Sequence, residues 1–297
     1  MDLPPGLTTR PLVPADAEAV RDLIAASELH DLGQVKIDLE DIVGDWQRPS
    51  FTIAEHSIGV EADGALVAYA EVYAGRFADA HVPPPHRGRG IGTFLAQWTQ
   101  DEARRQGGTL VGMPVPRDGD GDRLLTSLGY HVRWTSWILE LPAGTAIEPQ
   151  PIPQGCAIRE LCPGEERTAY QLIEDAFSEW PERRPTKYED WAAAAVLRPG
   201  FERWQMRLME DGTGTVVGVS FVLVSDDCAY IDRLAVRKDK RGLGLARALL
   251  VDSFERAKEH GATRSELSTD SRTGALGLYE RVGMKVTSTW LHRAIAV

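Results

Sequence analysis

The chain has 297 residues, of which 43% are hydrophobic and 26% are charged, a composition typical of globular proteins. Its formal net charge of −11 argues against nucleic acid as the main partner, because phosphate binding requires clustered lysine and arginine. The acidity is compatible with a cationic acceptor, although solubility alone also explains it. The length allows two domains, each with its own core.

The first nine residues lack a basic stretch followed by an apolar core, so they are not expected to form a signal peptide. The longest nearly unbroken apolar run, Val216 to Val224, has about half the length that a membrane span needs. Three cysteines without a CxxC pair indicate reduced thiols and no zinc site: Cys156, Cys162 and Cys228. We therefore expect a cytoplasmic protein with no membrane partner and no metal; the oligomeric state does not follow from the sequence.

The first half begins with an extended run, Leu7 to Leu12, and a helix is expected from Pro14 to about Ala26, capped near Asp16. Strand-like segments follow at Phe51–Ala54, Gly59–Glu61 and Ala65–Tyr73. The last of these comes directly after Asp63-Gly64, which is typical of a tight hairpin turn.

The second half repeats this plan. Its expected elements are an extended run at Ala157–Leu161, helices at Glu165–Phe177 and Tyr188–Val196, and strands at Gln205–Glu210, Val216–Val224 and Ala229–Val236. Each half is therefore expected to be an α+β domain with a mixed, largely antiparallel sheet flanked by helices. Residues 142–155 carry four prolines and indicate a linker between domains at 1–141 and 156–297.

One short sequence occurs twice, 154 residues apart. It reads VPPPHRGRGIG at residues 82–92 and VRKDKRGLGLA at residues 236–246. Each copy follows a strand-like run and precedes an amphipathic helical pattern, which in the second half runs from Leu243 to about Glu259. The offset continues without a gap to Gly129 and Gly283, so one structural unit has been used twice.

The repeated sequence has the features of an anion site. A helix N-terminus offers unpaired N–H groups and the positive end of the helix dipole. The glycines let the backbone approach an anion, and Arg241 or Arg87 adds a charge that can donate two hydrogen bonds to phosphate. Neither a G-x-G-x-x-G dinucleotide pattern nor a P-loop ending is present in either copy.

The pattern Arg-x-x-Gly-x-Gly/Ala between a strand and a helix resembles the acyl-CoA motif of the GNAT superfamily of N-acyltransferases. Here it is Arg87-x-x-Gly90-x-Gly92 and Arg241-x-x-Gly244-x-Ala246. A second family signature follows in the C-terminal half as ALGLYERVGM at residues 275–284. The resemblance covers nearly the whole chain as a tandem pair, an arrangement that includes mycothiol synthase-like members, although no residue set here selects their substrate.

The resemblance implies acyl transfer from acetyl-CoA, or another acyl-CoA, to a primary amine of a small molecule or peptide, by direct attack in a ternary complex. In the family the strand before the motif splays from its neighbour and holds the pantetheine arm with its backbone. The residues that this implies for cofactor binding are Leu234, Ala235, Val236, Arg241, Gly242, Leu243, Gly244, Leu245 and Ala246, with Arg87, Gly88, Gly90 and Gly92 in the first half.

The two halves differ where the family places a tyrosine that protonates the departing thiolate. A phenol can donate this proton, and Tyr279 occupies the position in the second half. The first half has Leu125 there, and Tyr130 is expected to point elsewhere. Three prolines before Arg87 also remove backbone donors. We therefore expect catalysis in the C-terminal half, and a degenerate N-terminal half that can still bind acyl-CoA. Packing under the sheet is the structural alternative for Tyr279.

A base for the amine is less clearly indicated. Tyr230, Asp232 and Leu234 share one face of a regular strand, so Asp232 is a candidate base and Tyr230 a candidate acceptor contact. An ion pair of Asp232 with Arg233 or Arg207 is an equally good structural explanation.

The acceptor and a cofactor phosphate have further candidate residues. Glu179, Glu182 and Trp180 lie between the two early helices of the second half, where charge and cation–π contact would hold a cationic amine. A solvated loop is the alternative for this charge cluster. Arg272 stands where many members of the family have asparagine, and it is a candidate contact to a CoA phosphate.

Two non-catalytic hypotheses compete with the transferase. In one, both halves bind acyl-CoA and neither transfers it, so the protein is a sensor or regulatory module. In the other, the second half is a scaffold for a protein partner. Tyr279 favours the enzyme, because a pure binding module needs no phenol at that position.

Overall fold

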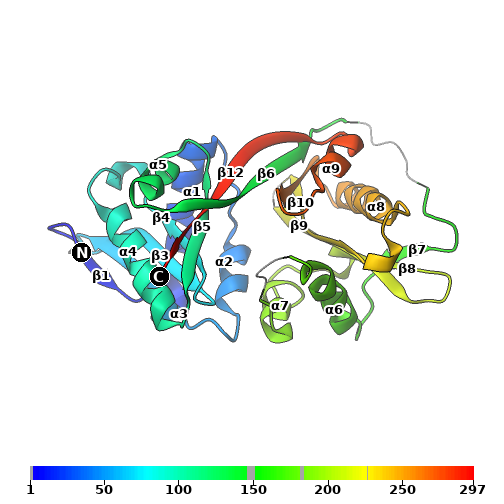
Figure 1. The fold of residues 1–297 in the computed structure, drawn as a ribbon, viewed down its shortest axis with the longest axis horizontal. Helices are drawn as coiled ribbons and strands as arrows, with labels where there is room; N and C mark the ends of the chain where they lie inside the picture. The colour runs from blue at the N-terminus through cyan, green and yellow to red at the C-terminus, as the bar shows by residue number, and fades with distance from the viewer. Residues whose placement is uncertain (1–2, 146–150, 181–183, 226) are drawn as a thin grey trace. The chain divides into compact units, whose positions relative to one another are not determined.

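The computed structural model describes residues 3–145, 151–180, 184–225 and 227–297 (Figure 1). The chain forms two compact units: Met1–Thr135 with Trp290–Val297, and Ser136–Thr289. Part of the linker expected at 142–155, and Glu182 of the expected acceptor region, lie outside the described residues.

The N-terminal unit is a mixed sheet covered by helices on both faces. Its elements are β1 (Thr8–Arg10), α1 (Ala17–Leu32), α2 (Leu39–Trp46), α3 (Ile53–His56), β2 (Ser57–Ala62), β3 (Ala65–Tyr73), β4 (Phe77–His81), α4 (Ile91–Arg105), β5 (Leu110–Pro116), α5 (Asp120–Ser127) and the start of β6 (His131–Leu141). The strand order is β1-β2-β3-β4-β5-β12, and β4 and β5 form its parallel pair. Helices α1 and α2 pack on the face that carries Tyr69, and α4 packs on the opposite face.

The C-terminal unit repeats this architecture. Its elements are β7 (Ala157–Glu160), α6 (Glu166–Phe177), α7 (Tyr188–Ala194), β8 (Met206–Glu210), β9 (Val216–Ser225), β10 (Cys228–Val236), α8 (Leu245–Glu259), β11 (Arg264–Asp270), α9 (Leu276–Val282) and β12 (Lys285–Ala296). The strand order is β6-β11-β10-β9-β8-β7, with β10 and β11 parallel. Helices α6 and α7 cover one face, and α8 and α9 cover the other.

The two units exchange their last strands. Residues 136–141 of β6 pair with β11 and complete the sheet of the C-terminal unit. Residues 290–296 of β12 pair with β5 and complete the sheet of the N-terminal unit. The last strand of the first half therefore completes the sheet of the C-terminal unit, and the last strand of the second half completes the sheet of the N-terminal unit.

The expected α+β fold with a mostly antiparallel sheet is confirmed, and three local expectations need correction. The strand expected at Phe51–Ala54 is instead helix α3, because Phe51 turns into the core and the backbone of residues 53–56 closes a helical turn. Helix α1 extends to Leu32, where Gly33 ends it in a left-handed conformation with φ of 76°. The sequence reading also missed α2, whose start is marked by Asp38 accepting a hydrogen bond from the N–H of Asp41.

The glycine-rich repeats occupy equivalent places in the two units. Each starts with a short 3-10 turn, Pro84–His86 or Lys238–Lys240, and leads into α4 or α8 through a glycine N-cap. None of the helices in the part of the chain described here has the length and apolar character needed to cross a membrane. The three cysteines are free thiols.

Candidate functional site

The strands β10 and β11 separate in the C-terminal unit. They pair in parallel from Cys228 and Arg264 as far as Ile231 and Leu267, and the recorded pairing stops there. Strand β10 continues to Val236, with β9 bonded along its other edge. The backbone groups of residues 232–236 that point away from β9 therefore face an opening between strands, which we call the strand opening. An extended ligand can add to such an edge by backbone hydrogen bonds.

A glycine turn, residues 241–244, lies at the end of β10. Gly242 and Gly244 have φ of 78° and 85°, which favours glycine, and an added Cβ at either would meet no atom within 4 Å. Among the described residues, the N–H groups from Gly242 to Ala246 have no recorded hydrogen-bond partner. These amides stand at the N-terminus of α8, where the helix dipole favours an anion. The open space and the unpaired donors fit a pyrophosphate.

Arg241 braces this glycine turn. Its Nε donates to the carbonyl oxygen of Val236 over 3.2 Å, and its two terminal nitrogens donate to the carboxylate of Glu179 over 3.1 and 3.0 Å. Its backbone N–H points to the carbonyl of Lys238 at 3.4 Å, so this amide is already engaged. The guanidinium that sequence reasoning assigned to a phosphate therefore binds a carboxylate of the protein.

Trp180 follows Glu179 in the segment after α6 and makes a second contact, with Arg272. The guanidinium of Arg272 lies 4.7 Å from the centroid of the Trp180 ring, and the Phe177 ring packs edge-on against the indole with centroids 4.5 Å apart. Arg272 also donates from Nε to Asp270 over 3.1 Å, and Asp270 ends β11. Glu179 contacts the turn after β10, and Trp180 contacts Arg272, the second residue after β11. This segment therefore links the two strands that separate.

Strand β10 is irregular at Asp232. Ile231 lies opposite Val222 and Arg233 lies opposite Phe221, so Asp232 is an extra residue, a β-bulge. Ile231 packs into the core under α8 whereas Ala235 packs into the core under α6 and α7, although a regular strand would put both on one face.

The bulge changes which candidate residues share a face. Leu234 packs on the α8 side, and Tyr230, next to Ile231, points to the α6 side. The shared face expected for Tyr230, Asp232 and Leu234 is therefore wrong. Burial raises the pKa of Tyr230, and Asp232 pairs with Arg233 over 2.7 Å. The other expected partner, Arg207, binds Asp252 over 2.6 Å instead.

Tyr279 lies in α9 within the core formed under α8, against which Leu234 also packs. It is 9% exposed, and burial raises the pKa of its phenol to about 12. No hydrogen bond to its hydroxyl is recorded within the described ranges. A neutral phenol without a partner, on the same side of β10 as Leu234, is available to donate to a ligand in the strand opening.

A cavity of about 850 Å³ lies beside Glu179 in the C-terminal unit. Helix α6 lines one side of it with Arg167 and Asp175, and the turn after β10 lines another with Arg237 and Lys238. A ligand held at the glycine turn would have this charged cavity next to it.

The N-terminal unit repeats the strand opening and the glycine turn. Its parallel pair β4 and β5 is recorded at Phe77 and Gly112 alone, while β4 continues to His81. Gly88 and Gly90 have φ of 71° and 87°, matching the C-terminal turn. Glycine is favoured at position 92 by lack of space, because a Cβ there would come within 2.8 Å of Leu124 Cδ2. The strand opening and the glycine turn are therefore present twice.

The arginine of this turn is held by two carboxylates. Arg87 donates to the Val82 carbonyl over 2.8 Å, to both oxygens of Asp31 over 2.7 Å, and to Asp120 over 3.0 Å. Arg123 and Arg87 hold the pKa of Asp120 below its ordinary value. Two carboxylates around one guanidinium leave less positive charge for a phosphate than the single Glu179 leaves at Arg241.

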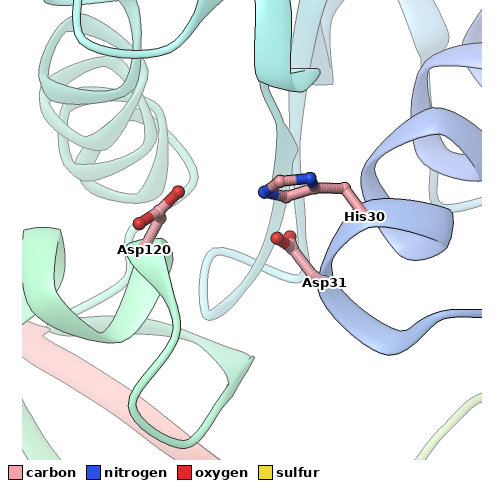
Figure 2. A group of neighbouring side chains, drawn as sticks. All are labelled: His30, Asp31 and Asp120. Atoms are coloured by element: carbon pink, nitrogen blue, oxygen red, sulfur yellow. The ribbon is translucent and has the colours of Figure 1, made fainter.

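Figure 2 shows His30 and Asp31 of α1 near Asp120 of α5, with potential ligand atoms all within 4.8 Å of one another. This spacing would suit a metal ion, but Arg87 already pairs with both carboxylates and all three residues are exposed. We assign the group to the support of Arg87.

The equivalent of Tyr279 in the N-terminal unit cannot donate a proton. Leu125 fills this place in α5 and is 3% exposed. The neighbouring Tyr130 is buried, and its hydroxyl donates to the carbonyl of Ala96 over 3.2 Å. The Tyr130 hydroxyl therefore already donates its proton in a hydrogen bond to the protein backbone.

Sequence reasoning missed one titratable cluster of the N-terminal unit, formed by Tyr69, Glu71, Asp79 and His81 on β3 and β4. The available signal was the two-residue period of polar residues on either side of the turn, Tyr69-x-Glu71 and Asp79-x-His81.

The strand opening, the glycine turn and the helix N-terminus define an acyl-CoA-binding fold, present in tandem. The model of the Acetyltransferase (GNAT) family matches residues 20–120 and 167–284, and the chain belongs to this family. It is therefore an N-acyltransferase that uses acetyl-CoA or another acyl-CoA.

Its relatives include mycothiol acetyltransferases. That of Salinispora arenicola is 29% identical over 248 residues, covering 77% of this chain and 78% of the relative. That of Actinosynnema mirum is 26% identical over 296 residues, covering 92% and 93%.

Solved structures agree over the whole chain. A GCN5-related N-acetyltransferase from Sphaerobacter thermophilus has a TM-score of 0.79 at 28% identity, covering 99% of this chain and 97% of that one. A tandem GNAT protein from the clavulanic acid biosynthesis pathway has a TM-score of 0.75 at 18% identity, covering 98% of each chain, and shows the shared fold.

Proposed function

We propose that the C-terminal unit transfers an acyl group from acetyl-CoA to a primary amine of a small molecule, by direct attack of the amine on the thioester. The observation that carries this proposal is the placement of Tyr279 on the same side of β10 as Leu234, at a strand opening that ends in an unobstructed glycine turn. The relatives named mycothiol acetyltransferase support a small-molecule acceptor.

The backbone supplies most of the cofactor binding in this proposal. The amides of Gly242 to Ala246 bind the pyrophosphate, and the free edge of Leu234, Ala235 and Val236 bonds the pantetheine arm. Arg241 keeps the turn in shape through the Val236 carbonyl. Its terminal nitrogens reach phosphate in exchange for Glu179, so these two acceptors compete for one guanidinium.

Tyr279 stabilises the leaving thiolate. As the amine nitrogen bonds to the thioester carbon and the carbon–sulfur bond breaks, the negative charge on sulfur accepts a hydrogen bond from the phenol. Complete transfer from a phenol of pKa about 12 to a thiolate of ordinary pKa near 8.5 is uphill by roughly 5 kcal/mol. Tyr279 therefore keeps its proton and donates only a hydrogen bond, and the thiolate leaves as an anion that takes its proton from water.

Asp232 receives the amine proton through water in this scheme. The bulge lifts this residue out of the regular strand, and Arg233 holds its carboxylate at 2.7 Å. The Phe177–Trp180 segment forms the acceptor side of the opening, with Glu179 and Trp180 tied to Arg241 and Arg272. Tyr230 lies on the α6 side of β10, which is the side of this segment.

The test compares Tyr279→Phe with Tyr130→Phe, each of which removes the hydroxyl of one buried tyrosine. Amine-dependent release of thiol from acetyl-CoA is measured for a panel of amino sugars, amino acids and polyamines. Tyr279→Phe should lower kcat about 100-fold with little change in acetyl-CoA affinity, and Tyr130→Phe should leave kcat unchanged. Equal kcat values in wild type and Tyr279→Phe would remove the phenol from the reaction. Binding without release of thiol for every amine would favour an acyl-CoA sensor.

A further inference from the structure

The 3-10 turns that precede the two glycine turns have the same backbone shape. Arg87, which ends the first turn, has φ of −69° and ψ of 162°, and Arg241, which ends the second, has φ of −72° and ψ of 160°. The N–H of each arginine points to the carbonyl oxygen at the start of its turn, over 3.2 Å at Pro84 and 3.4 Å at Lys238. Both glycine turns therefore begin from the same geometry.

In the N-terminal unit, proline rings restrict this turn. It carries Pro83, Pro84 and Pro85, and each ring fixes one φ near about −65°. A proline at the first position of a helical turn also loses no hydrogen bond, because an N–H there has no partner within the turn. The N-terminal turn therefore depends little on side-chain contacts for its shape.

In the C-terminal unit, ion pairs take the place of the prolines. The equivalent residues at the 154-residue offset are Arg237, Lys238 and Asp239. Arg237 donates to both oxygens of Asp239 over 2.6 and 2.7 Å. Lys240, the last residue of the turn, has its Nζ 3.3 Å from Oδ2 of Asp211.

Asp211 is held firmly by the hairpin in which it lies. Its Oδ1 accepts from the N–H and the hydroxyl of Thr213 over 3.0 and 2.6 Å and from the N–H of Thr215 over 3.3 Å, while its Oδ2 faces Lys240. The hydrogen bonds from Thr213, and next the contact with Lys240, hold the pKa of Asp211 below its ordinary value. A carboxylate already fixed by its own turn loses little conformational entropy when it pairs with a lysine.

The hairpin itself differs between the two units. Strands β2 and β3 are joined by Asp63-Gly64, whereas β8 and β9 are joined by a longer turn, residues 211–215. The N-terminal unit has His86 at the place of Lys240. The longer hairpin and the lysine therefore occur together, in the unit that lacks the prolines.

Asp211 lies on the side of β10 opposite the strand opening. Its hairpin leads into β9, which bonds one edge of β10, whereas the opening faces β11 at the other edge. Asp211 can therefore affect a ligand in the opening only through Lys240 and the turn. In this it differs from Glu179, which binds the terminal nitrogens of Arg241 directly.

We propose that Asp211 is a positioning residue for the acyl-CoA site of the C-terminal unit. By anchoring Lys240, it keeps the 3-10 turn in the shape that prolines impose on the N-terminal turn. The amides of Gly242 and Gly244 then stay directed at the pyrophosphate. This inference rests on the proposed cofactor site, and the experiment distinguishes failure of the one from failure of the other.

The first test is the variant Asp211→Asn. The asparagine oxygen still accepts from the hairpin amides, so the hairpin is kept while the charge that holds Lys240 is lost. Binding of acetyl-CoA is followed through the amide shifts of Gly242 and Gly244 in the ¹⁵N-labelled full chain. We expect the Kd measured at these amides to rise at least about threefold, the loss of one partly exposed ion pair. The matched control Asp63→Asn removes the same charge from the N-terminal hairpin and should leave this Kd unchanged.

The second test replaces the ion pair by a proline. Lys238 corresponds to Pro84, and among the described residues its N–H has no recorded acceptor. Arg237 before it has φ of −50° and ψ of 135°, an extended conformation that a following proline accepts. Lys238→Pro should therefore fix the turn without Asp211, so that adding Asp211→Asn changes the Kd less than twofold. Lys238→Ala loses the same charge without fixing the turn, and there Asp211→Asn should still raise the Kd at least threefold.

An unchanged or lower Kd in Asp211→Asn would overturn the proposal, because the freed lysine would then only add charge for the ligand. A rise of equal size in the Lys238→Pro and Lys238→Ala backgrounds would also overturn it, since Asp211 would not act through the shape of the turn. If Asp211→Asn gives no folded spectrum, Lys240→Gln breaks the same pair and decides by the same criteria. If acetyl-CoA shifts neither glycine amide in the wild type, the proposed cofactor site is wrong and this role of Asp211 is wrong with it.

Discussion

Glu179 and Arg241 form an ion pair with two hydrogen bonds, which ties the segment after α6 to the glycine turn before α8. Lys238 Nζ lies 3.4 Å from the same carboxylate, and Arg241, with Lys238, holds the pKa of Glu179 below its ordinary value. Glu179, which was expected to contact the acceptor, thus accepts hydrogen bonds from the guanidinium of Arg241, which was expected to contact the cofactor.

Replacement of Glu179 by alanine should therefore tighten acetyl-CoA binding. The change frees the terminal nitrogens of Arg241 and removes a negative charge beside the glycine turn. We expect the Kd to fall about three- to fivefold, since an exposed ion pair is weak and screened by solvent. Calorimetric titration measures it, with Glu189→Ala as control for an exposed acid of α7 that pairs with Arg167. A Kd that rises, or falls equally in both variants, would contradict competition at Arg241.

Glu71 should make the free energy of unfolding depend on pH. Its pKa is about 8 in the folded protein against an ordinary 4.5, so between these values the folded protein keeps a proton that the unfolded chain has lost. Stability from this group is complete below about pH 4.5 and is lost as the pH rises through about 8. Glu71→Gln removes the effect, so its Tm should exceed that of wild type by a few degrees at pH 9 and by less at pH 5.

Thermal unfolding at the two pH values measures this difference. Glu55→Gln, an exposed acid of α3, serves as control and should follow wild type at both pH values. A Tm difference between Glu71→Gln and wild type that is the same at pH 5 and pH 9 would show that Glu71 has an ordinary pKa.

Truncation after Thr289 should damage the N-terminal unit, although it removes the C-terminal end of the chain. Strand β5 would lose its antiparallel partner along residues 110–116, and Trp134 would lose its stacked neighbour His292, at a centroid distance of 3.7 Å. Hydrogen exchange should become faster in β5 and stay slow in β8 and β9. Faster exchange in β8 and β9 with β5 unchanged would contradict the exchanged strand.

The sequence was sufficient for the features that depend on neighbouring residues. The glycines of both turns need a left-handed backbone, and each such turn joins a strand to an amphipathic helix, so the repeat located both glycine turns. Leu125 against Tyr279 distinguished the two units, because only one of these side chains carries a proton donor.

Other parts of the site depend on residues far apart in the chain. Arg241 pairs with Glu179, 62 residues away in the sequence, and Arg87 pairs with Asp31, 56 residues away. No local pattern marks either pair. The bulge at Asp232 inserts one residue without a characteristic sequence and reverses the face of Tyr230 relative to Leu234. The strand exchange was hidden because both halves have the same order of elements.

The most direct test of catalysis in the C-terminal unit is a matched pair of variants, Gly244→Ala and Gly90→Ala. Both glycines are helix N-caps with φ near 85°, so each substitution adds a Cβ under the same backbone strain. The quantity to measure is kcat/KM for acetyl-CoA in amine-dependent thiol release. Gly244→Ala should lower it at least tenfold, and Gly90→Ala should leave it within about twofold of wild type. A large loss in Gly90→Ala with Gly244→Ala unaffected would place the reaction in the N-terminal unit and contradict this account.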